Sequence, residues 1–75
     1  MGTGPTNQVK MIALITPYKS QFDQWVSDFG REDEQYIFVS KIDDVRGRYF
    51  AAIQKGFTFY RVHPDVVEAA KQRIR

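Results

Sequence analysis

The sequence predicts an α+β fold built on a small mixed sheet of three to four strands. Two helices pack on one face of this sheet, in the order β-α-β-(β)-β-α. Short segments rich in β-branched and aromatic residues alternate with segments whose apolar residues recur at helical spacing. The chain has 75 residues and no cysteine, so one small core has to form without disulfides. Six Phe, four Tyr and one Trp supply the large side chains for it.

The first strand is expected after a polar segment. Residues 1–9, MGTGPTNQV, contain two glycines and a proline without periodicity, which is typical of a flexible tail. We therefore expect a single domain over residues 10–75, with its first strand at residues 10–16. No segment approaches the ~20 apolar residues of a membrane span, and no signal peptide is recognisable. Together with the lack of cysteine, this favours a cytoplasmic protein.

A helix is predicted directly after the first strand. Thr16 is expected as its N-cap, with Pro17 in the first turn. Apolar residues then recur at i, i+4, i+7, i+8 and i+11, on one face of a helix: Tyr18, Phe22, Trp25, Val26 and Phe29. Gly30 is expected to end the helix. This face should pack on the sheet and place Trp25 in the core.

A loop, a second strand and a last helix complete the secure elements. Residues 31–34, REDE, predict a solvated loop, and residues 35–42, QYIFVSKI, predict a strand that Asp43 and Asp44 end. His63-Pro64-Asp65 predicts the start of the last helix. Its apolar stripe consists of Val66, Val67, Ala70 and Ile74. Cations, which the helix dipole favours, occupy its last turns: Lys71, Arg73 and Arg75.

Residues 45–54 allow two interpretations. A helix would place Val45, Tyr49, Ala52 and Ile53 on one face, but it would contain Gly47 at a cost of about 1 kcal/mol. A strand would instead form a hairpin with residues 57–62 around Lys55-Gly56. We favour the hairpin.

Residues 55–62, KGFTFYRV, resemble the aromatic octapeptide of RNA-recognition motifs. Lys55, Gly56, Phe57 and Phe59 match the basic residue, the glycine and two aromatics of that pattern. Aromatic residues two apart share a face of a strand, and bases stack on such rings for ~1–3 kcal/mol each. A small core needs these rings, however, so we expect Phe57 and Phe59 to face the helices. Tyr60 would then face solvent.

Two further segments resemble the second motor domain of superfamily-1 helicases. Residues 14–26, LITPYKSQFDQWV, match a strand that ends in Thr-Pro-Tyr before a Gln-bearing helix. Residues 43–50, DDVRGRYF, match the glycine-and-arginine loop of that domain, which lies at its nucleotide and nucleic-acid interface. The chain has no Gly-rich phosphate loop ending in Lys-Ser/Thr. The resemblance therefore implies a half-domain that binds without turning over nucleotide.

Charge is distributed unevenly along the chain. Residues 1–44 hold four basic and seven acidic side chains, whereas residues 45–75 hold seven basic and two acidic ones. The second half therefore predicts a basic face for phosphate or for an acidic protein. The single histidine, His63, cannot by itself build a transition-metal site. Adjacent carboxylates in loops favour turn and cap roles over acid–base chemistry, so we expect no enzyme, no cofactor and no metal.

The opening MIALITPYKSQFDQWVSDFG and the basic-aromatic stretch RGRYFAAIQKGFTFYRV resemble small bacteriophage transcription regulators that bind host RNA polymerase, of the kind found in Xanthomonas-infecting phages. The resemblance implies a non-enzymatic inhibitor of sigma-dependent initiation, acting in the host cytoplasm and affecting termination (antitermination). The residues expected to contact the polymerase are basic or aromatic: Lys41, Arg46, Arg48, Tyr49, Lys55, Tyr60 and Arg61. The alternative is a single-stranded RNA- or DNA-binding module that uses residues 55–62.

Overall fold

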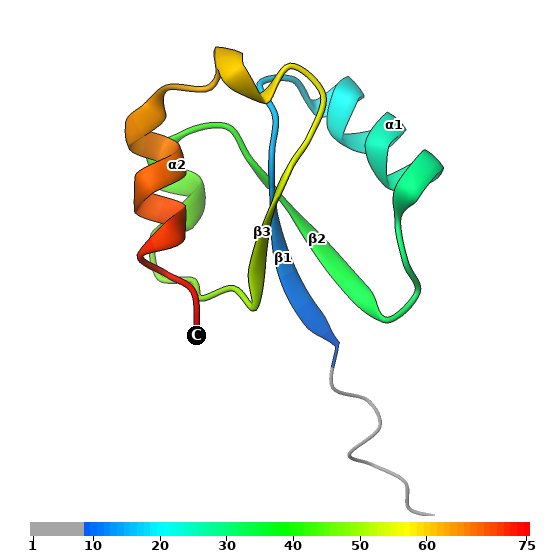
Figure 1. Cartoon of the computed structure of the whole chain (residues 1–75), viewed down its shortest axis with the longest axis horizontal. Helices are drawn as coiled ribbons and strands as arrows, with labels where there is room; N and C mark the ends of the chain where they lie inside the picture. Colours follow the sequence, from blue (N-terminus) through cyan, green and yellow to red (C-terminus); the bar gives the residue numbers. More distant parts are fainter. Residues whose placement is uncertain (1–8) are drawn as a thin grey trace, which may run out of the picture.

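A three-stranded sheet lies between two helices in the computed structural model of the chain, which describes residues 9–75 (Figure 1). The elements in chain order are β1 (Lys10–Ile15), α1 (Lys19–Phe29), β2 (Glu34–Val39), β3 (Ala52–Lys55) and α2 (Pro64–Lys71). The predicted α+β class, with its two helices and three strands in this order, is confirmed. The tail expected at residues 1–9 falls, apart from Val9, outside the described residues.

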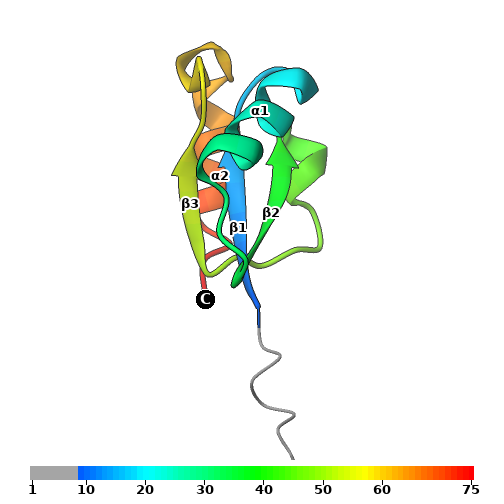
Figure 2. The same ribbon diagram turned by 90° about the vertical axis from the view of Figure 1, so that its right-hand side faces the viewer.

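All three strands run parallel, in the order β2-β1-β3. The two helices lie on opposite faces of the sheet (Figure 2), so the prediction that both cover one face is wrong. The physical reason is the handedness of crossovers between parallel strands, which is almost always right-handed. The chain moves from β1 to β2 in one direction and from β2 past β1 to β3 in the other. Right-handed crossovers in opposite directions cover opposite faces.

The predicted hairpin between residues 49–54 and 57–62 is also wrong. β3 pairs with β1, in a parallel register that places Ile12 beside Ala52 and Ile15 beside Lys55. Residues 57–58 form a turn, with Thr58 in the left-handed region at φ 50°, and a 3-10 helix follows at Phe59–Arg61. The helical alternative for residues 45–54 fails too, because the only helical part of that region is the end of a 3-10 helix at Ile42–Val45.

Gly56 keeps the chain close beside β1 after the end of β3, where the hairpin prediction required a reversal. Its backbone N–H donates to the carbonyl oxygen of Ile15 at 2.9 Å. A Cβ at this position would lie 3.2 Å from that oxygen and 3.3 Å from Cδ1 of Leu14. The glycine therefore serves a close approach to β1, which extends the parallel pairing beyond the end of β3.

The main core lies on the face of the sheet that α2 covers. Its members are apolar and buried: Ala13, Ile15, Val39, Val45, Phe50, Val62, Val66 and Ala70. Phe50, only 1% exposed, is the largest of them. Of the predicted apolar stripe on α2, Val66 and Ala70 are buried, Val67 packs at the margin, and Ile74 lies beyond the end of the helix.

The other face of the sheet carries a looser aromatic layer beneath α1. Ile12 and Leu14 of β1 are buried here, but no residue of α1 is. Instead, rings pair across the layer, with centroids 5.4 Å apart for Phe22 and Phe38 and 5.3 Å apart for Trp25 and Tyr36. The middle of the predicted face therefore packs, with Phe22, Trp25 and Val26 half-buried. Its ends do not, since Tyr18 is 54% and Phe29 56% exposed, and Trp25 is not part of the main core.

The ends of α1 differ from the prediction at the start and agree with it at the end. Tyr18, not Thr16, is the N-cap residue, and no side chain caps the helix. The buried Thr16 instead donates its hydroxyl to the carbonyl oxygen of Phe57 at 2.8 Å. Gly30 is the C-cap, where a Cβ would collide with the carbonyl oxygen of Val26.

Candidate functional site

Two distant segments meet where the chain enters β3. Phe50 donates its backbone N–H to the carbonyl oxygen of Arg73 at 2.8 Å, and its own carbonyl oxygen accepts from the N–H of Arg75 at 2.9 Å. These bonds form an isolated parallel bridge between Phe50 and Ile74. Figure 1 shows the C-terminus next to the start of β3 at the lower end of the sheet. The buried ring of Phe50 fixes this junction in the core.

An arginine–tyrosine cluster forms at this junction. It is defined here as Tyr49, the two arginines over its ring, Arg73 and Arg75, and Arg48, which directly precedes Tyr49 in the chain. The guanidinium carbon of Arg75 lies 3.8 Å from the centroid of the Tyr49 ring, and that of Arg73 lies 5.5 Å from it. The tyrosine is 44% exposed. Cation–π contacts of this kind contribute about 0.5–1 kcal/mol each at exposed sites. They hold two positive charges beside a ring that faces solvent.

Within the described part of the chain, no carboxylate forms an ion pair with the arginines of the cluster, since none lies within 4.0 Å of the guanidinium groups of Arg48, Arg73 or Arg75. The neighbouring cations differ, since Arg46 pairs with Asp43 at 3.4 Å and Lys71 pairs with Glu68 at 3.3 Å. Both of these pairs are exposed and therefore weak. The three cluster arginines remain available for anionic groups of a partner.

Local backbone geometry explains how Arg48 and Tyr49 reach this position. The carboxylate of Asp44 accepts from the backbone N–H groups of Ser40 and Lys41, at 3.0 and 3.2 Å, and so holds the 3-10 helix at Ile42–Val45. Gly47 then adopts φ 69°, a conformation that favours glycine. This turn redirects the chain toward the start of β3.

The structure divides the predicted contact residues between the two ends of the sheet. Arg48 and Tyr49 belong to the cluster, and Arg46 precedes it at the end of the 3-10 helix. The others lie at or after the carboxyl ends of β2 and β3, at the opposite end of the sheet: Lys41, Lys55, Tyr60 and Arg61. The 59–61 segment lies at the top of Figure 1, away from the C-terminus. The predicted residues therefore do not form one site.

Arg73 and Arg75 were not among the predicted contact residues. They were expected only as cations that the dipole of the last helix favours. α2 ends at Lys71, so neither arginine lies in its last helical turn. Their spacing offered a signal, because residues two apart in an extended segment both fall on one side of it. Only the bridge to Phe50, however, brings that segment to Tyr49.

The segment that resembles an RNA-recognition strand does not form a stacking platform. Phe57 lies 6.1 Å, centroid to centroid, from Phe29 at the end of α1, whereas Phe59 packs against the main core on the α2 face. The expectation that both rings turn inward holds for Phe59 but not fully for Phe57, which is 37% exposed and lies outside the main core. Tyr60 is 72% exposed, as predicted. The two phenylalanines therefore do not share one open face.

The residues that resemble a helicase motor domain close the carboxyl ends of β1 and β3. Besides the bond from Thr16 to Phe57, the hydroxyl of Thr58 donates to Oε1 of Gln21 on α1. In open parallel sheets, ligands bind in a crevice at the carboxyl ends of two neighbouring strands whose connections go to opposite faces. In this chain, the hydrogen bonds of Thr16 and Thr58 span that position between β1 and β3. Thr16 and Gln21 thus tie β1 and α1 to the turn after β3.

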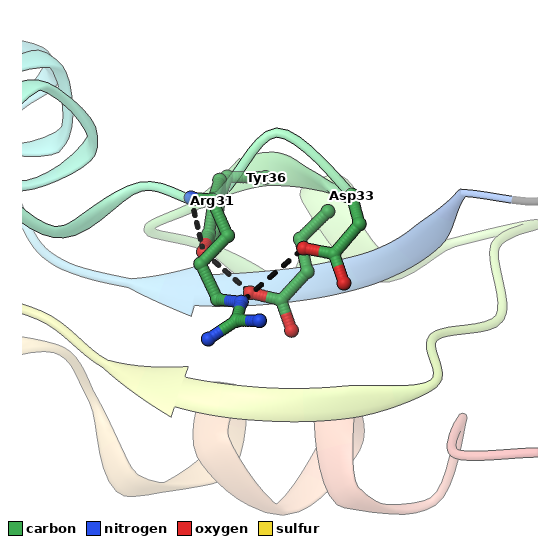
Figure 3. A network of polar contacts seen from close by, with 4 residues as sticks. Arg31, Asp33 and Tyr36 are labelled. Carbon is green, nitrogen blue, oxygen red and sulfur yellow. Dashed lines mark hydrogen bonds and ion pairs between the residues drawn. The ribbon is translucent and has the colours of Figure 1, made fainter.

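A polar network fixes the loop between α1 and β2 (Figure 3). Nε of Arg31 lies 3.2 Å from Oδ1 of Asp33, and this hydrogen bond raises the pKa of Arg31 and lowers that of Asp33. The Tyr36 hydroxyl donates to Glu34 at 2.5 Å and accepts from the backbone N–H of Arg31 at 3.2 Å. Burial raises the pKa of Tyr36, and the bond to Glu34 raises it further. The network anchors the start of β2.

Comparisons with known proteins add no relative. No protein-family model, curated protein or solved structure matches this chain. None of the helices within residues 9–75 is long and apolar enough to cross a membrane. Nor does this part of the chain bring together three or more His, Asp or Glu side chains that could hold a metal ion. The arginine–tyrosine cluster, where two cations lie over a partly exposed ring, is the strongest candidate site.

Proposed function

We propose that this chain is a non-enzymatic transcription regulator that binds an acidic surface of bacterial RNA polymerase through the arginine–tyrosine cluster. The observation that carries the proposal is the pair of arginines, Arg73 and Arg75, against one exposed tyrosine ring, with Arg48 next to that tyrosine in the chain. None of the three has a carboxylate partner within the described residues. Arginine suits this role because its planar fork pairs with carboxylates in bidentate fashion. Tyrosine and arginine are also the residues that most often anchor protein interfaces.

A protein surface fits the cluster better than a single-stranded nucleic acid does. Stacking of a base needs an open aromatic face, but the guanidinium of Arg75 lies 3.8 Å from the centre of the Tyr49 ring. The alternative function was expected to use residues 55–62, whose Phe57 and Phe59 turn to different parts of the molecule. Carboxylates, by contrast, reach the rims of the guanidinium groups without displacing them.

The choice of RNA polymerase as partner rests on the resemblance to small phage transcription regulators. On this proposal the protein acts in the host cytoplasm, inhibits sigma-dependent initiation and affects termination. Its basic half would meet an acidic polymerase surface, and long-range attraction between opposite charges would speed their association.

Titration of nuclease-treated bacterial RNA polymerase against the immobilised chain tests this proposal. A triple variant of the cluster, Arg48→Ala with Arg73→Ala and Arg75→Ala, should weaken binding by about tenfold or more. The matched control removes three cations from the opposite end of the sheet, as Lys41→Ala with Lys55→Ala and Arg61→Ala. It should change affinity by less than about threefold, and circular dichroism should show that both variants fold.

Three results would refute the proposal. The first is a polymerase that fails to bind the wild-type chain once nucleic acid has been digested. The second is binding that the control triple abolishes and the cluster triple leaves intact, since the contact would then lie at the other end of the sheet. The third is tight binding of a bare oligonucleotide that competes with polymerase at equal salt.

A further inference from the structure

We infer that the hollow between β3 and α2 binds a small amphiphilic anion, that is, a molecule with an apolar chain and one anionic head group, such as a medium-chain carboxylate. The head group would pair with Lys55, and the chain would lie along Ile53 and Val67 toward Ile74. This inference goes beyond the proposed function, because it concerns another surface and a small molecule, and it does not depend on RNA polymerase as the partner.

The hollow has the size and the lining of a small-molecule site. Its volume is about 600 Å³, within the range of roughly 300–1,000 Å³ that is usual for such sites. Ile53 of β3 and Val67 of α2 are half-buried and line it, together with Ile74, which is 45% exposed. An alkyl chain placed over these three side chains would remove apolar surface from water.

The two elements place these side chains along one groove. Ile53 and Lys55 are two residues apart in β3 and therefore lie on the same face of the sheet, and Ile53 packs against the core on the α2 side. Val67 and Lys71 lie one turn apart on one side of α2. Because β3 and α2 run in opposite directions (Figure 1), Lys55 stands at the upper end of the groove and Ile74 at the lower end.

The C-terminal segment bounds the groove at its lower end. Ile74 forms the parallel bridge with Phe50 directly before β3, and the N–H of Phe50 donates to the carbonyl oxygen of Arg73 at 2.8 Å. This segment therefore crosses the end of the groove that is opposite Lys55. A polypeptide that followed β3 along its length would have to pass the segment, whereas a chain with a free end can stop at Ile74.

The charged side chains that line the hollow are both cations, Lys55 and Lys71. Lys71 already pairs with Glu68 at 3.3 Å. Lys55 has no carboxylate within 4.0 Å among residues 9–75, and its ammonium lies 5.1 Å from the centroid of the Phe59 ring. A lysine ammonium is a compact point charge, so Lys55 selects a small anionic head group, while the methylene stem of Lys71 borders the chain.

Monomeric decanoate is the probe that tests this inference. We expect saturable binding by isothermal titration calorimetry with a negative heat-capacity change. In a ¹⁵N spectrum, the backbone amides of Ile53, Lys55 and Val67 should be among those that shift most. Octanoate should bind about threefold to tenfold more weakly, because two fewer methylenes are buried. Decanol and decyltrimethylammonium, which lack the negative charge, should each bind at least about fivefold more weakly than decanoate.

Two substitutions separate the head group from the chain. Lys55→Gln should weaken decanoate binding by at least about fivefold and remove the preference over decanol. Val67→Thr keeps the shape of the side chain but adds a hydroxyl to the apolar wall, and should weaken decanoate and decanol alike. The matched control, Arg61→Gln, removes a cation outside the lining and should change the affinity for decanoate by less than about twofold. Circular dichroism should show that all three variants fold.

Several results would overturn the inference. One is the absence of saturable binding, and another is equal affinity for decanoate and decanol. A third is binding to phosphatidylglycerol vesicles without binding of monomeric decanoate, which would make a membrane surface the ligand. A fourth is a set of shifts at the same amides that follows protein concentration without any ligand, together with a doubling of mass, because a second copy would then fill the hollow.

The decanoate titration contains no polymerase, so its failure and the failure of the proposed function are distinguishable. Lys55→Gln should remove most of the decanoate binding and leave the polymerase titration unchanged. If both titrations respond to this substitution, the hollow and the arginine–tyrosine cluster are parts of one interface, and the inference of a separate small-molecule site is overturned.

Discussion

The unequal packing of the two faces of the sheet makes a quantitative prediction about Phe50 and Trp25. Phe50 is the largest fully buried side chain, at 1% exposure, whereas Trp25 is half-buried and contacts the rings of Phe29 and Tyr36. Phe50→Ala should therefore cost about 3–5 kcal/mol of unfolding free energy, through lost burial and the cavity that remains. Trp25→Ala should cost about 1–3 kcal/mol, because it removes two aromatic pairs and partial burial.

Urea denaturation followed by far-ultraviolet circular dichroism measures both values without relying on tryptophan fluorescence. A chain of this size has roughly 4–11 kcal/mol of stability in total, so Phe50→Ala should lie close to the limit of folding. Phe50→Leu provides a milder comparison and should cost less than about 1.5 kcal/mol. If Trp25→Ala destabilises the chain as much as Phe50→Ala does, the aromatic layer beneath α1 is the principal core, and the assignment to the α2 face is refuted.

Two further substitutions test local features. Gly30→Ala should destabilise the chain by roughly 1–3 kcal/mol, because its Cβ would collide with the carbonyl oxygen of Val26; a melting temperature equal to that of the wild type would contradict this. Tyr36→Phe removes the hydroxyl between Glu34 and the N–H of Arg31, and should cost about 0.5–1.5 kcal/mol near neutral pH. The folded chain raises the pKa of Tyr36. Its protonated form therefore stabilises the fold below the ordinary pKa, and this contribution is lost as pH rises through the folded value. Urea midpoints measured between neutral and strongly alkaline pH should converge for wild type and Tyr36→Phe; a constant difference would contradict the reasoning.

The sequence by itself determined those elements that depend only on residues close together in the chain. The apolar run of β1, the aromatic face of α1 and the glycine at its end were all predicted, and each depends on residues within a few turns of one another. The basic character of the second half and the exposure of Tyr60 likewise follow from composition and local pattern.

Tertiary structure alone decided the direction of β3, the faces that the helices cover and the residues that surround Tyr49. A four-residue strand such as β3 pairs equally well with a neighbour in either direction as far as its own sequence is concerned. Its partner is chosen by distant contacts, chiefly the burial of Phe50 and the approach of Gly56 to β1. The same contacts draw Arg73 and Arg75, more than 20 residues away, to the ring of Tyr49. Such pairings balance loop-closure entropy against burial in a shared core, and neither quantity can be read from a single segment.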